Sequence, residues 1–128
     1  MLYTATKGRA RTSNFELWSW LFMRISGVFL LVLILAHLAI MHVFQPIESV
    51  TFAFVSVRWS IPVWRWYDLT MLILALLHGL NGARVVSDDL IHSRGWRVAV
   101  MATLYTFALV FLVVGAQIIL SFQPFVGR

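Results

Sequence analysis

Ionisable side chains inside apolar segments are the residues of this sequence best placed to do chemistry. His78 lies in the run "LALLHGLNGARVVSDDL", which continues through small residues to Arg84 and Asp89. A histidine within an apolar span costs free energy, and histidine there can ligate a metal, carry a proton or bond to a neighbouring helix. The sequence thus leaves three interpretations of His78 open: a haem iron ligand, a proton carrier and a neutral group bonded to another helix.

The residues that follow His78 are arranged along one helix by depth. Arg84 lies about 9 Å nearer the membrane edge at helical rise, where it could meet the propionates of an upright haem; the alternative is a snorkelling anchor. Gly79, Gly82 and Ala83 leave room for a flat macrocycle, and a close helix–helix contact would explain them nearly as well.

Two adjacent acids, Asp88 and Asp89, end this stretch at the membrane edge. An acid next to a cationic arginine can tune a proton-coupled site. The alternative is that Ser87 or Asp88 caps a short following helix over "DLIHSR".

A second set of candidates lies on the first apolar segment. His37 is about 20 Å inward from Arg24, whereas His78 is about 9–15 Å from the same edge, so the two histidines should not share one iron. A haem at His78 would then take its second ligand from another polypeptide. His37 could bind a second haem or be a buried, hydrogen-bonded histidine. Arg24, with Ser26 beside it, could donate to a quinone carbonyl or a haem propionate, or simply orient the segment.

The elements that position these residues are membrane helices. The chain is 61% hydrophobic and 12% charged, which is outside the usual range for soluble domains. Three segments, approximately 20–44, 64–87 and 96–122, are long enough to cross a bilayer. We predict an all-α integral membrane protein with one domain, residues 1–128, whose three transmembrane helices pack in a bundle with a partner subunit.

Local signals refine these segments. Ser13 and Glu16 match a capping box, so the first helix should begin before the membrane. Residues 45–62 are expected to form the one sizeable loop, and the aromatic residues near its end are typical of a membrane-interface belt. The basic but polar N-terminus does not resemble a cleaved signal peptide.

The positive charges predict orientation and exclude other functions. Seven lysines and arginines lie on the side of the N-terminus and the loop between the second and third spans, against three on the other side. This places the N-terminus in the cytoplasm. The formal net charge of +5 is explained by these flanking residues, so no nucleic-acid partner is expected. The absence of cysteine excludes thiolate chemistry.

Taken together, "RISGV" and "HGLNGARVVSDD" resemble the haem b membrane anchor subunits of succinate dehydrogenase (succinate:quinone oxidoreductase). The family pattern is Arg-x-Ser-Gly-Val, then His-x3-Gly-x-Arg-x4-Asp. The likeness extends over "NFELWSWLFMR" and all three spans. The matching positions are Arg24, Ser26, Gly27, Val28, His78, Gly82, Arg84 and Asp89.

The resemblance implies a chain that carries no catalytic residues and works inside an electron-transport complex of the tricarboxylic acid cycle. With a second membrane anchor it would hold haem b and dock an iron–sulfur subunit and a flavoprotein subunit on the cytoplasmic face of the inner membrane. His78 matches the haem ligand, and His37 stands where members with two haems use a further histidine. Arg24 and Asp89 match residues beside the quinone site, and Arg24 also matches the arginine near the propionates.

The sequence departs from the family at three positions. Leu90 replaces a tyrosine common in the other anchor, Met23 replaces a histidine, and Trp20 replaces a quinone-contacting serine, with Ser19 shifted by one. The quinone site should therefore be shared with other subunits. Two alternatives stay open: an anchor of a fumarate reductase, hydrogenase or other cytochrome b complex, and a small structural or transport subunit without haem.

Overall fold

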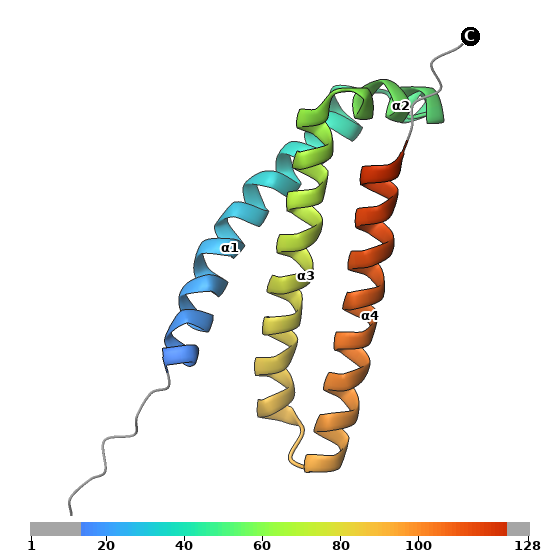
Figure 1. Cartoon of the computed structure of the whole chain (residues 1–128). Coiled ribbons are helices and arrows are strands. Elements are labelled where there is room, and N and C mark those ends of the chain that lie inside the picture. Colours follow the sequence, from blue (N-terminus) through green and yellow to red (C-terminus); the bar gives the residue numbers. More distant parts are fainter. Residues whose placement is uncertain (1–13, 123–128) are drawn as a thin grey trace, which may run out of the picture.

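The chain folds into long helices joined by short connections, as Figure 1 shows. The structure, a computed structural model, describes residues 14–122. In chain order the elements are α1 (Asn14–Leu38), a π-helix η1 (Ala39–Val43), a 3-10 helix η2 (Ile47–Ser49), α2 (Phe52–Ser60), α3 (Pro62–Leu90) and α4 (Arg94–Ser121). Ser13 of the predicted capping box and the basic N-terminal segment lie outside the described residues.

Three of these helices are long and apolar enough to cross a membrane: Asn14–Val43, Pro62–Leu90 and Arg94–Ser121. The predicted all-α membrane fold is therefore confirmed, and each helix contains or closely matches a predicted apolar segment. α3 lies between α1 and α4, and α3 and α4 run antiparallel side by side (Figure 1). Pro62 in the first turn suits the start of α3, because a residue there has no intrahelical partner for an amide hydrogen.

The prediction that residues 45–62 form a loop is wrong. The segment contains helix α2, which lies across the ends of α3 and α4 opposite the α3–α4 connection; we call these the outer ends (Figure 1). The Thr51 side chain caps α2 by accepting a hydrogen bond from the Phe54 amide at 3.4 Å. Aromatic contacts of Phe52 and Trp59 with Phe122 hold α2 against the end of α4.

The interpretation of residues 89–94 as a short helix capped by Ser87 or Asp88 is also wrong. α3 continues without interruption through Asp88 and Asp89 to Leu90, and α4 starts at Arg94. The two acids therefore belong to the last turn of a membrane helix.

Few side chains are buried within the chain itself. Among the described residues, the buried apolar side chains are Leu30, Leu69, Ala108 and Ile119. Most large apolar side chains of the three long helices are exposed on their outer faces. Such surfaces need lipid or other membrane helices around them.

Candidate functional site

His78 lies in the seam between α3 and α1. Its Nδ1 atom is 2.8 Å from the Ser26 hydroxyl, and Ser26 is only 3% exposed. A Cβ atom added at Gly27 would lie 3.3 Å from His78 Cε1, which is tighter than ordinary contact. Ser26 and Gly27 therefore hold one edge of the imidazole ring, and within the described residues Ser26 is its hydrogen-bond partner.

Arg84 lies further along the same seam, toward the α3–α4 connection, and is tied to α1. Its guanidinium donates to Ser19 Oγ at 3.2 Å, and it pairs with Glu16 at 3.3 Å. It also reaches Asn81 Oδ1 at 3.4 Å, and that oxygen accepts a bond from Ser19 at 2.9 Å. Asn81 Nδ2 is buried without a hydrogen-bond partner among the described residues. The sequence analysis missed Asn81, although it lies about one turn from His78.

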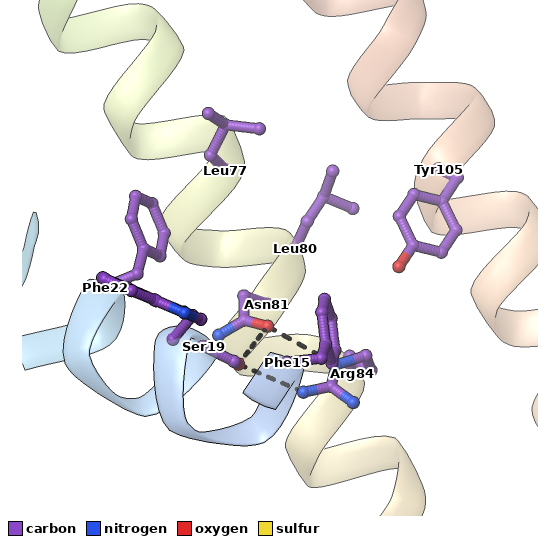
Figure 2. Close-up of a pocket in the computed structure, with 9 residues that line it drawn as sticks. Phe15, Ser19, Phe22, Leu77, Leu80, Asn81, Arg84 and Tyr105 are labelled. Atoms are coloured by element: carbon purple, nitrogen blue, oxygen red, sulfur yellow. Dashed lines mark hydrogen bonds between the residues drawn. The ribbon is translucent and has the colours of Figure 1, made fainter. Parts of the chain in front are cut away.

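Grooves flank this polar cluster on both sides of α1. One, of about 350 Å³, lies between α1, α3 and Tyr105 of α4, as Figure 2 shows. Its lining is apolar except for a few groups; the polar members are Ser19, Asn81, Arg84 and Tyr105. The other, of about 600 Å³, lies between Trp20 and Met23 of α1 and Gly82 of α3. Apolar grooves with a few convergent polar groups are the usual form of a small-molecule site.

The small residues of α3 do not form one wall. A Cβ added at Gly82 would approach the Met23 side chain at 3.4 Å, on the α1 side. Gly79 and Ala83 face α4 across a cavity of about 230 Å³. The two glycines that follow His78 therefore reduce side-chain volume on different sides of α3: Gly82 on the side of α1 and Gly79 on the side of α4.

The remaining residues of the predicted cytoplasmic edge, Arg24 and Asp89, lie apart from His78. Arg24 is exposed and stacks on Trp20 at 4.4 Å, and Asp89 is exposed. Neither Arg24 nor Asp89 has an ion pair or hydrogen bond within residues 14–122. Asp88, by contrast, pairs with Arg97 at 3.5 Å. The chain alone therefore does not bring Arg24, Ser26 and Asp89 together.

A second polar cluster lies at the outer end of the seam. Asp68 of α3 accepts hydrogen bonds from Arg58 at 2.9 Å and from Trp59 Nε1 at 2.8 Å, both on α2. Its Oδ1 is also 3.5 Å from His37 Nδ1 on α1. We name these residues, Arg58, Trp59, Asp68 and His37, the outer cluster. Sequence reasoning missed Asp68, although an acid inside a predicted span was a signal that could have found it.

The two histidines occupy different levels. His37 is level with Tyr67 and Asp68, since its ring stacks on Tyr67 with centroids 6.4 Å apart. His78 is about 15 Å further along α3 at helical rise. This agrees with the prediction that the two histidines lie at different depths. Among the described residues no group of three or more histidines, cysteines or acids could hold a bare metal ion.

The fold and the two clusters define a class: a helical membrane subunit that keeps polar and ionisable side chains between its spans and leaves its outer surfaces for other components. The chain belongs to the family of succinate dehydrogenase/fumarate reductase transmembrane subunits, whose model matches residues 4–115. The predicted resemblance is therefore confirmed. No curated protein matches the chain closely enough to count as a relative.

Proposed function

We propose that this chain is a haem b-binding membrane anchor of succinate dehydrogenase that also contributes to the quinone-reduction site. The observation that carries the proposal is the bond between Ser26 and His78 Nδ1. Metal-binding histidines usually bond one ring nitrogen to a second group, which fixes the tautomer and leaves the other nitrogen for the metal. In this arrangement His78 Nε2 is the iron ligand, and when bound the haem would carry single electrons within the complex.

The surroundings of His78 fit such a group. Gly27 supplies the clearance that the ring needs, and the grooves around α1 adjoin the seam. Arg84 and Arg24 are the cations available for propionates at the cytoplasmic edge. Arg84 would exchange long bonds, of 3.2–3.4 Å, for shorter ones to a propionate carboxylate. The second axial ligand would come from a second membrane anchor.

His37 is the candidate ligand for a second haem nearer the outer face. Its side chain is 32% exposed, so one edge of the ring is accessible to a group outside the chain. Its distance along the seam from His78 requires that any iron it binds be a separate one.

The quinone site is proposed at the cytoplasmic edge, with Arg24, Ser26 and Asp89 as this chain's contributions. Arg24 and Asp89 are exposed and form no ion pair within the described part of the chain, which suits groups completed by other subunits. The Ser26 hydroxyl is already bonded to His78, so its part in quinone binding is the least supported of the three. The N-terminus would lie in the cytoplasm, where flavoprotein and iron–sulfur subunits would dock on the inner membrane.

Two further functions compete with this proposal. The family also includes fumarate reductase subunits, which would use the same anchor with electrons flowing the other way. A structural or transport subunit without haem is favoured by the fact that the Ser26–His78 bond is itself a helix–helix contact.

A reduced-minus-oxidised spectrum of the purified complex tests the haem assignment. We expect His78→Ala to abolish the b-type absorption of one haem, because no other histidine of the chain lies at that level. His42→Ala is the matched control, since His42 is exposed at the outer end and should leave the spectrum unchanged. A full haem content in His78→Ala would refute the assignment and leave the helix-contact interpretation.

A further inference from the structure

We infer that Asp68 is a positioning residue for His37: it holds the imidazole through Nδ1, so that Nε2 is the nitrogen presented for metal binding. The inference rests on the second haem proposed above and adds a residue to it. Asp68 does not contact the haem in this arrangement and acts only through the histidine.

The carboxylate of Asp68 is fixed from one side and open on the other. Arg58 donates to Oδ1 and Trp59 donates to Oδ2, so α2 sets the orientation of both oxygens. The Asp68 side chain is 12% exposed and that of Arg58 is 6% exposed. A carboxylate oxygen accepts more than one hydrogen bond, so Oδ1 can also serve a donor on α1.

The donor that faces it is His37. Its Nδ1 is buried, 3.5 Å from Asp68 Oδ1, and it has no hydrogen-bond partner in the described part of the chain. A movement of about half an ångström would bring this pair to ordinary hydrogen-bond length. A proton on Nδ1 would then point at the carboxylate, and the lone pair would lie on Nε2. A carboxylate behind a ligating histidine is a common arrangement in metal sites, where it sets the ring orientation and raises ligand basicity.

The neighbours of His37 support a fixed ring. The Tyr67 ring lies parallel to it, with an interplanar angle of 6°, and the Tyr67 hydroxyl is itself anchored on the Leu33 carbonyl. The π-helix η1 starts just after His37, and such interruptions are frequent at functional sites. A clamp between α2 and α3 would need only Arg58, Trp59 and Asp68, so it does not explain why the carboxylate also faces a buried histidine nitrogen.

The test uses the purified complex and compares Asp68→Asn with His37→Ala, Trp59→Phe and the wild type. Haem per complex, the low-spin electron paramagnetic resonance signal and the midpoint potential are measured. We expect His37→Ala to remove one haem. Asp68→Asn should keep that haem but shift its resonance and raise its midpoint potential, because a negative charge behind the ligand is lost. Trp59→Phe removes one bond of the clamp without changing the charge, and it should leave both properties unchanged.

The outcomes separate the two claims. If His37→Ala keeps its full haem content, the second haem and the role of Asp68 both fall. If His37→Ala loses a haem while Asp68→Asn keeps the wild-type resonance and potential, the second haem stands and the positioning role is refuted. If Trp59→Phe shifts both properties as much as Asp68→Asn, attachment of α2 explains the effect and the inference is overturned. If Asp68→Asn does not assemble, Asp68→Glu replaces it, and an unshifted resonance in that variant counts against the inference.

Discussion

At each end of the α1–α3 seam, a histidine of one helix packs against a polar group of the other helix, and the polar groups differ. The inner end is the one around His78 and Arg84. At the inner end, a histidine on α3 meets a serine on α1, and hydroxyl, amide and exposed charged groups surround them. At the outer end, a histidine on α1 meets a carboxylate on α3, and that carboxylate is neutralised by a buried arginine. The two ends are thus reciprocal in helix order, and the group that faces the histidine is a neutral hydroxyl at the inner end and a carboxylate at the outer end.

The difference indicates which charged groups the chain encloses itself and which it leaves exposed. The outer charge pair finds its partners within this chain, because α2 folds over it. At the inner end, Arg24 and Asp89 are exposed and have no ion pair among residues 14–122. Buried polar atoms without a hydrogen-bond partner among these residues occur at both ends, as Asn81 Nδ2 and His37 Nδ1 show. We therefore expect quinone and neighbouring subunits to contact the exposed charges of the inner end, and we expect bound groups to satisfy buried atoms at both ends.

The largest effect in this comparison is expected at the outer ion pair. Arg58→Met would leave Asp68 as an unpaired, largely buried charge, which costs about 3 kcal/mol or more. Since α2 is attached through this pair, its amides should exchange with solvent roughly 100-fold faster, because each 1.4 kcal/mol is tenfold. Hydrogen exchange of Phe52–Ser60 in the complex measures this.

Arg97→Met is the matched control for this outer substitution. It removes the same side-chain type from an exposed pair, since Asp88 and Arg97 are 49% and 38% exposed. Exposed pairs contribute about 0–1 kcal/mol, so α2 exchange should not change. Equal exchange rates in Arg58→Met and the wild type would mean that the outer cluster does not hold α2.

Much of the fold and part of the two polar clusters could be predicted from the sequence. The parts that were missed have a physical cause. Span length and apolar content predicted three helices, because backbone groups inside a membrane must be satisfied within each segment. Helical rise alone predicted that His37 and His78 lie at different depths, but it placed His78 further from the level of Arg24 than the Ser26–His78 bond allows. Helix α2 was missed because its apolar and aromatic residues indicated a membrane interface without showing any regular element.

The direction in which each side chain points could not be predicted from the spacing of residues in the sequence. Gly79 and Gly82 are close in sequence, yet they face different helices, and only the packing of α3 between α1 and α4 decides which. Ser26 was predicted for quinone, and its hydroxyl bonds to His78 because α1 presents that face to α3. Asp68 needed the fold of α2 before its partners could be recognised.

At the inner end, the quinone role of Asp89 predicts a kinetic effect. Asp89→Asn should lower succinate-driven quinone reduction at least about tenfold, because it removes a proton-transferring group from the edge of the site. Asp88→Asn is the control, since Asp88 is paired with Arg97 and should leave the rate near the wild-type value. A wild-type rate in Asp89→Asn, with intact assembly, would remove Asp89 from the site.

The smallest effect is expected at the inner ion pair, and it tests how open that end is. The side chains of Glu16 and Arg84 are 57% and 21% exposed in this chain, so Glu16→Gln should lower stability by less than about 1 kcal/mol. Amide hydrogen exchange in the first turns of α1 should therefore become less than about fivefold faster. A neighbouring subunit that covers the groove beside Arg84 would dehydrate this pair and raise the loss toward that of Arg58→Met. An increase well above tenfold would therefore contradict the contrast between the two ends, because the inner pair would then be as enclosed in the complex as the outer one.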